Sequence, residues 1–66
     1  MKIKDEFIKL GQAMKLAALV SEGVEAKYAI LNEEVQVNGE ICTQRGKKLY
    51  PGDAFTYKGK TITIES

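Results

Sequence analysis

The apolar residues of this chain change their spacing near Val35, and that change constrains the fold more than any other feature of the sequence. Before Val35 they recur at intervals of about three and four, which is typical of one face of a helix. After Val35 they alternate with polar residues, which is typical of one face of a strand. The pattern predicts two helices followed by a small antiparallel sheet, an α+β fold in a single domain that covers residues 1 to 66.

A first helix is predicted to run from about Leu10 to Val20. The stretch Ser21-Glu22-Gly23 then interrupts the helical pattern. Upstream of the helix, Met1 to Ile8 alternates loosely and is expected to form a short strand or an irregular arm on the core. The face of the first helix that we expect to be buried comprises Leu10, Ala13, Met14, Leu16, Ala17, Leu19 and Val20.

A second helix is predicted to begin near Val24, where Ser21 or Gly23 can cap it. Glu25 stands favourably in its first turn, because a negative charge there interacts well with the helix dipole. Asn32 can end the helix, since asparagine tolerates the left-handed conformation at a helix end. The face expected to be buried comprises Ala26, Ala29 and Ile30.

The dipeptide Asn38-Gly39 predicts a tight hairpin turn, because both residues accept a positive φ. A strict two-residue turn would pair Ile41 with Gln36 and leave Ile41 on the face opposite Val37. A bulge or a longer loop would instead return Ile41 to the core. The sequence leaves these two alternatives open.

Two further turns are predicted in the second half of the chain. Tyr50-Pro51-Gly52-Asp53 has proline and glycine at the central positions of a type II turn, and Leu49 before it is expected in the core. Gly59-Lys60 is expected to form a two-residue turn that brings Tyr57 opposite Ile62. The residues on one shared face would then be Phe55, Tyr57, Ile62 and Ile64.

The composition argues against several classes of protein. Cys42 is the single cysteine and histidine is absent, so an internal disulfide is impossible and a zinc site built from Cys and His lacks ligands. No Ser, Thr or Cys has a visible base to activate it, so we expect neither an enzyme nor a cofactor. The longest apolar stretch, Ala17 to Val20, is too short to span a membrane. Because no signal peptide is visible either, we expect a cytoplasmic protein.

Positive charge gathers in one loop, although the formal net charge is only +1. Thr43 to Tyr50 holds three cations and no acid, and Arg45 is the strongest candidate to grip a phosphate because its guanidinium binds in a bidentate manner. Lys15 and Lys27 would lie near this loop, on the outer face of the helical hairpin, if Leu16 points inward. Taken singly, each of these two lysines is better explained as a solubilising charge.

Three motifs between Glu25 and Asp53 resemble those of a known family. Glu25-Ala26 opens the second helix, Val35-Gln36-Val37-Asn38-Gly39 forms the hairpin, and Gly52-Asp53 precedes a strand. Over roughly residues 9 to 57 the chain resembles the RNA-binding domain named after small-subunit ribosomal protein S-four, also called the alpha-L motif. It is most similar to the short stand-alone bacterial members of that family.

The chain departs from this family at three places. Lys9-Leu10-Gly11 stands where the family often has Arg-Leu-Asp, Gly23 where it has an arginine, and Glu33 where it has the glycine that ends the second helix. The resemblance implies non-catalytic binding of structured RNA, either ribosomal RNA or transfer RNA, with the ribosome or a ribosomal subunit as a partner and no membrane or small-molecule substrate. The RNA-binding residues that we expect are Lys15, Lys27, Gln44, Arg45, Lys47 and Lys48.

Few side chains could read bases in such an RNA. Tyr28 and Tyr50 are the candidates for stacking, but each is expected at the margin of the core, so recognition of RNA shape is favoured. The alternative function is a small β-grasp module, either a sulfur carrier or a protein-interaction domain, because such modules share the early Asn-Gly hairpin and the Gly-Asp turn. Sulfur carriers need a Gly-Gly C-terminus, whereas this sequence ends in Ile64-Glu65-Ser66.

Overall fold

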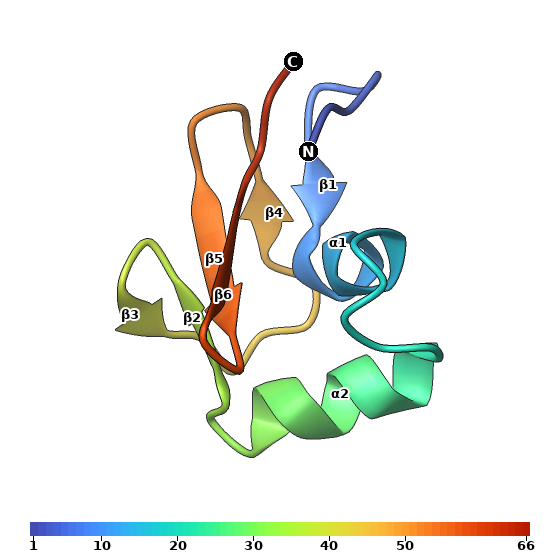
Figure 1. The fold of residues 1–66 in the computed structure, drawn as a ribbon, viewed down its shortest axis with the longest axis vertical. Helices are drawn as coiled ribbons and strands as arrows, with labels where there is room; N and C mark the ends of the chain where they lie inside the picture. Colours follow the sequence, from blue (N-terminus) through green and yellow to red (C-terminus); the bar gives the residue numbers. More distant parts are fainter.

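The computed structural model describes all residues from Met1 to Ser66 and has the predicted α+β fold (Figure 1). The larger sheet is antiparallel with the strand order β3-β2-β5-β6, and the two helices lie together on one side of it. A second, two-stranded ribbon pairs β1 with β4. In chain order the elements are β1 (Ile8–Lys9), α1 (Leu10–Leu16), α2 (Gly23–Leu31), β2 (Val35–Val37), β3 (Glu40–Ile41), β4 (Lys48–Leu49), β5 (Ala54–Tyr57) and β6 (Lys60–Thr63).

The first helix ends at Leu16, which is earlier than predicted. Ala18 takes the left-handed conformation with a φ of +59°, and its N–H donates to the Lys15 carbonyl. The N–H of Leu19 donates to the Met14 carbonyl. This pair of bonds is a Schellman closure, which ends a helix by turning the chain away from its axis. Leu16 lies on the outer face of the shortened helix and is 65% exposed, so the expectation that it is buried was wrong.

The start of α2 also differs from the prediction. The helix begins at Gly23 with Glu22 as its N-cap, so neither Ser21 nor Gly23 occupies the cap position. Ser21 acts one residue further out, where its backbone N–H and its hydroxyl donate to the Glu25 carboxylate at 2.9 and 3.1 Å. These bonds stabilise the charged form of the carboxylate and lower the pKa of Glu25.

A second Schellman closure ends α2. The N–H groups of Glu33 and Glu34 donate to the carbonyls of Ile30 and Ala29, respectively. The left-handed residue is Glu33, with a φ of +61°, while Asn32 has a φ of −83°. Asn32 is the C-cap and ends the helix as predicted, but the left-handed conformation expected of it was wrong, because the next residue makes the turn.

The hairpin between β2 and β3 has the predicted two-residue turn. Asn38 and Gly39 have φ values of +52° and +85°, which fit a type I′ turn. Gln36 pairs with Ile41, so the strict alternative is the correct one. Ile41 is 54% exposed and does not return to the core.

The turn between β5 and β6 lies one residue earlier than predicted. Lys58-Gly59 turns the chain, with φ values of +50° and +78°, instead of Gly59-Lys60. The glycine thus takes the second position, as it does in the first hairpin. Ile62 therefore pairs with Phe55 and not with Tyr57. Moving the turn by one residue shifts the pairing of β5 with β6 by two residues. Because side chains alternate along a strand, this even shift leaves the same side chains facing the core.

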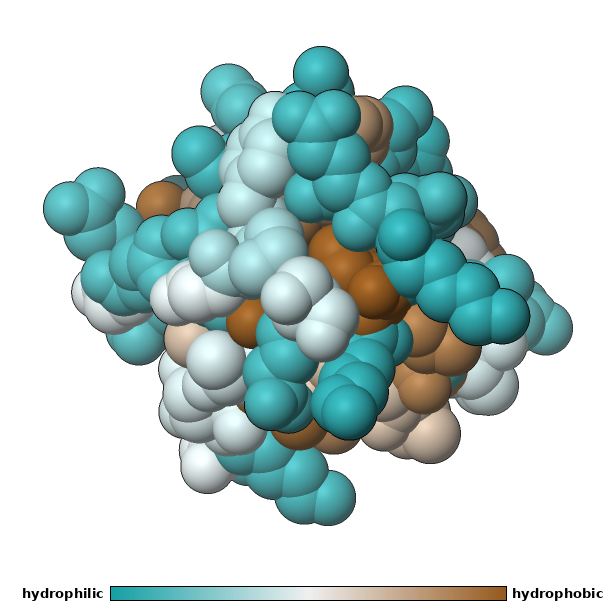
Figure 2. All heavy atoms as spheres, turned by 90° about the horizontal axis from the view of Figure 1, so that it is seen from above, coloured by the Kyte–Doolittle hydropathy of each residue, from teal (hydrophilic) through white to brown (hydrophobic).

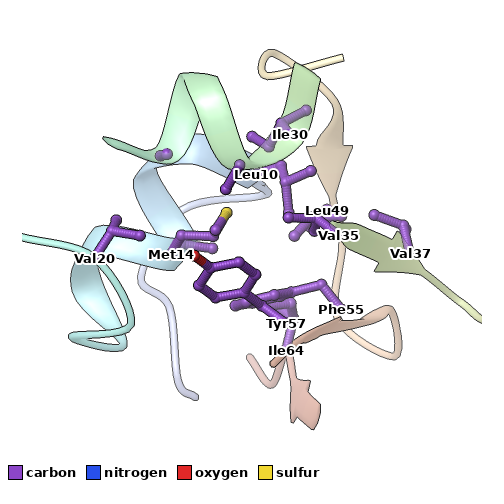
Figure 3. Packing of buried hydrophobic residues seen from close by; sticks show 13 residues of the cluster. Leu10, Met14, Val20, Ile30, Val35, Val37, Leu49, Phe55, Tyr57 and Ile64 are labelled. Atoms are coloured by element: carbon purple, nitrogen blue, oxygen red, sulfur yellow. The ribbon is translucent and has the colours of Figure 1, made fainter. Parts of the chain in front are cut away.

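The core lies between the helices and the sheet (Figure 3). It consists of apolar residues and Tyr57. The N-terminal arm packs against it, as expected, with Met1 and Ile3 in an irregular stretch and Ile8 in the short strand β1. Figure 2 views the end that carries both termini and shows hydrophilic residues around a patch of apolar atoms. Neither helix has the length and apolar character that crossing a bilayer requires. The buried residues are Leu10, Ala13, Met14, Val20, Ala26, Ala29, Ile30, Val35, Val37, Leu49, Phe55, Tyr57 and Ile64.

Candidate nucleic-acid interface

A hollow of about 370 Å³ lies where the start of α1, the start of α2 and the loop before β4 meet. We call it the cation pocket. Three of its side chains are positively charged, none is acidic and none is hydrophobic. The lining residues are Lys9, Gly11, Gln12, Lys15, Gly23, Arg45 and Gly46.

The backbone of α1 holds the basic loop in place. The N–H of Leu10 donates to the Lys47 carbonyl at 2.9 Å, and the N–H of Gly11 donates to the Arg45 carbonyl at 3.1 Å. These N–H groups belong to the first turn of a helix and have no partner within it. The loop therefore completes the helix, and the helix fixes the position of Arg45.

Gly11 allows Arg45 to lie directly against α1. A Cβ atom at position 11 would stand 2.8 Å from the Cγ of Arg45, which is too close for two carbon atoms. The aliphatic part of the arginine thus packs on the bare helix backbone. An aspartate, which the related family often has at this position, would both displace Arg45 and add an acid to the pocket.

The positive charges of the pocket have no acidic partner. The salt bridge in this structure joins the Met1 ammonium to the Glu65 carboxylate at 3.4 Å, on the N-terminal arm. Lys9, Lys15 and Arg45 form none. Because like charges in a shared hollow repel one another, an anion that bridges them would be stabilised there.

The structure divides the predicted site residues among several places. Lys15 and Arg45 line the cation pocket. Lys27 is exposed on α2, one helical turn after Gly23, and does not line the pocket.

Gln44 and Lys47 line a different hollow of about 420 Å³ beside the β2–β3 hairpin, together with Glu40. The Nζ atom of Lys48 lies 4.8 Å from the centre of the Phe7 ring, where the two make a cation–π contact. Arg45, Lys47 and Lys48 therefore have different surroundings, which are the cation pocket, the hollow beside the hairpin and the Phe7 ring, respectively. Their role in RNA binding stays a prediction.

Sequence reasoning missed four residues of the pocket, namely Lys9, Gly11, Gln12 and Gly23. Lys9 enters it because β1 pairs with β4, which sets Lys9 opposite Lys48 and brings the distant loop to the start of α1. Gly23 lines it because α2 begins one residue earlier than predicted. The acid-free character of the loop was a signal for Arg45, but nothing local marks Lys9.

The motif residues of the two turns form a separate hydrogen-bond cluster, which we call the turn clasp: Asn38, Tyr50, Asp53 and Ala54. The Asn38 side chain donates to Asp53 Oδ1 at 3.1 Å and accepts from the Ala54 N–H at 3.0 Å. Asp53 Oδ2 accepts from the Tyr50 N–H at 2.8 Å. The Tyr50 carbonyl accepts from the Asp53 N–H, as expected for the predicted type II turn.

The clasp keeps the Asp53 carboxylate charged. The hydrogen bond from the Tyr50 backbone, followed by the one from the Asn38 side chain, lowers the pKa of Asp53. The four residues of the clasp form hydrogen bonds with one another. Asn38 and Asp53 therefore stabilise the two turns, as expected for turn residues.

Both tyrosines were expected to pack at the margin of the core. Tyr50 is 43% exposed, and its ring contacts that of Phe7, with 5.7 Å between the ring centres. Tyr28 points outward from α2 and is 60% exposed, so that expectation was wrong for Tyr28. The reason is its helical phase, since it lies opposite the buried residues Ala26 and Ile30.

Comparison with known proteins identifies the family of this chain. A family model described as S4 domain matches residues 1–65. The chain is also 44% identical over 57 residues to "Probable ribosome maturation protein RlbA" of Bacillus subtilis (strain 168), a match that covers 86% of this chain and 80% of that relative. The chain belongs to the S4 domain family, and the resemblance inferred from its motifs is confirmed.

Proposed function

We propose that this protein binds structured RNA, in the first place ribosomal RNA, through the cation pocket and without catalysing a reaction. The observation that carries the proposal is the group of three unpaired cations, Lys9, Lys15 and Arg45, in a hollow without an acid. Each cation that neutralises a phosphate releases counterions and adds affinity. Membership of the S4 domain family and the name of the Bacillus subtilis relative, which refers to ribosome maturation, both support a ribosomal RNA in the cytoplasm.

The geometry favours phosphate contacts over the reading of bases. Gly23 and Gly46 leave open space on their Cα atoms, so an RNA backbone can approach the protein backbone closely. Arg45 can hold a phosphate through two N–H groups, while Lys9 and Lys15 act as point charges. No aromatic residue lines the pocket, so bases have no stacking partner in it. The protein would thus recognise the shape of a folded RNA.

The proposal is tested by fluorescence anisotropy with a labelled ribosomal RNA hairpin. Lys15→Ala/Arg45→Ala should weaken binding by about tenfold or more, because charge-assisted contacts to phosphate are each worth roughly 1 kcal/mol or more. The matched control is Lys58→Asn/Lys60→Ala, which removes the same charge from the β5–β6 hairpin, where neither residue lines the pocket. Asparagine suits position 58 because that residue has a positive φ.

Competing RNAs define the ligand more closely. Unlabelled ribosomal hairpin should displace the labelled RNA better than a single strand of the same composition does, because the pocket contacts a shaped backbone. Transfer RNA that competes better than the ribosomal hairpin would replace ribosomal RNA as the ligand. Equal weakening in the pocket variant and in the control would show that net charge, and not the pocket, governs binding.

A further inference from the structure

The outer face of α2 carries an apolar stripe that no other part of the chain covers. Val24, Tyr28 and Leu31 are four and three residues apart, so they align on one side of the helix. They are 50%, 60% and 54% exposed. In Figure 1, α2 runs along the lower edge of the molecule and no other element lies beyond it. We call these three residues the α2 stripe.

The surroundings of the stripe are acidic. Glu22 and Glu25 stand at the start of the helix and Glu33 and Glu34 directly after its end, while Lys27 is the one cation between them. None of the four carboxylates forms a salt bridge. The Glu25 carboxylate accepts hydrogen bonds from Ser21, whereas those of Glu22, Glu33 and Glu34 have no hydrogen-bond partner. The stripe is thus an apolar surface with an unpaired negative charge at its start and two at its end, whereas the cation pocket is a polar hollow with unpaired positive charges.

This charge selects among the partners that could cover the stripe. A nucleic acid would bring phosphates close to the carboxylates, which costs energy. A second copy of the chain, packed helix against helix, would bring the same acids together across the contact. A basic protein segment would instead pair its cations with the glutamates while its apolar residues cover the stripe.

We propose that the α2 stripe docks a basic amphipathic helix of a partner protein. Stripe residues at positions i, i+4 and i+7 are the anchors that such helix-to-helix contacts use. Val24 and Leu31 supply apolar contacts at the two ends, and the Tyr28 ring covers the middle with a hydroxyl that can stay in water. Gly23 belongs to the cation pocket and Val24 to the stripe, so a bound RNA and a bound protein would be neighbours. The inference does not depend on RNA binding.

The probe is a helical peptide built from leucine and lysine, titrated into isotope-labelled protein and followed by NMR. We expect amide shifts at the α2 stripe and binding that weakens as salt is added. Val24→Ser/Leu31→Ser should reduce the affinity by about tenfold, as loss of apolar anchors does. Glu33→Gln/Glu34→Gln should reduce it by about threefold at low salt, because surface pairs contribute less.

A matched peptide of leucine and glutamate should not bind. The proposal is overturned if both peptides bind equally, if neither binds, if the shifts lie away from α2, or if the unliganded protein dimerises through this face. Because the serine variants change exposed side chains, the fold should persist, and circular dichroism checks this. Their affinity for the ribosomal RNA hairpin should equal that of the parent, which separates a failure of this inference from a failure of RNA binding.

Discussion

The turn clasp and the cation pocket show two opposite ways of using polar side chains. In the clasp, Asn38 and Asp53 bond to each other and to nearby backbone groups, so their hydrogen-bonding capacity is used within the protein. In the pocket, Lys15 and Arg45 have no acidic partner at all. The difference supports a stabilising role for the clasp residues and the proposed ligand-binding role for the pocket residues. Changes in the turn clasp should therefore alter the free energy of unfolding and leave RNA affinity unchanged. Changes in the cation pocket should alter RNA affinity and leave the free energy of unfolding unchanged.

The largest effect on stability is expected at Gly39. Its φ of +85° is unfavourable for a β-branched residue, so Gly39→Val should lower the free energy of unfolding by roughly 1–3 kcal/mol. Urea denaturation measures the change. Gly39→Asn is the control and should lose less, because asparagine tolerates the left-handed region. Equal losses for valine and asparagine would contradict the conformational explanation.

Asp53→Asn should lower the free energy of unfolding by about 1 kcal/mol at neutral pH, because the single oxygen of an amide cannot accept both the Tyr50 N–H bond and the Asn38 side-chain bond. It should also change the pH dependence. The folded state lowers the pKa of Asp53 below its ordinary 3.8, so its contribution to stability is fully present above that value. That contribution is lost as the pH falls through the lower, folded pKa.

The variant should therefore lose less stability than the parent does on acidification below the ordinary pKa of aspartate. Part of the acid sensitivity should remain, because Glu25 also has a lowered pKa through its bonds to Ser21. Unfolding curves at a series of pH values test this. Parent and variant curves that stay parallel in acid would mean that the clasp does not set the ionisation of Asp53.

The two Schellman closures offer a gain in stability. Ala18 and Glu33 hold positive φ values of +59° and +61°, which cost energy for any residue with a Cβ atom. Ala18→Gly and Glu33→Gly should each raise the free energy of unfolding by about 0.5–1 kcal/mol. The thermal midpoint measures the gain, and RNA affinity should not change. A loss of stability in both variants would show that the loops do not hold these conformations in solution.

The smallest effect comes from a change that alters no charge. Gly11→Ala places a Cβ atom 2.8 Å from the Cγ of Arg45, so the arginine side chain has to shift within the pocket. RNA affinity should fall by about threefold, corresponding to roughly 0.6 kcal/mol. The control is Arg45→Ala, in which a further Gly11→Ala change should have no effect because no arginine is left to displace. An RNA affinity of Gly11→Ala equal to that of the parent would exclude a positioning role for Gly11.

The sequence was informative where structure is set by neighbouring residues and misleading where it is not. Asn38-Gly39 predicted its turn because both residues favour the required φ, and the even shift of the β5–β6 register left Phe55 in the core. The end of α1 was missed because nothing about Ala18 favours a left-handed conformation. The pocket was only half predicted, because Lys9 reaches Arg45 through the long-range pairing of β1 with β4.

The most direct test of the division between fold and ligand site is the salt dependence of RNA binding, measured with the ribosomal hairpin for the parent and for Lys15→Ala/Arg45→Ala. Two lost phosphate contacts should reduce the slope of log affinity against log salt by about 1.4–1.8. The free energy of unfolding should change by less than about 0.5 kcal/mol, because both side chains are exposed and neither forms a salt bridge. An unchanged slope, or the same reduction in Lys58→Asn/Lys60→Ala, would contradict the assignment of RNA binding to the cation pocket.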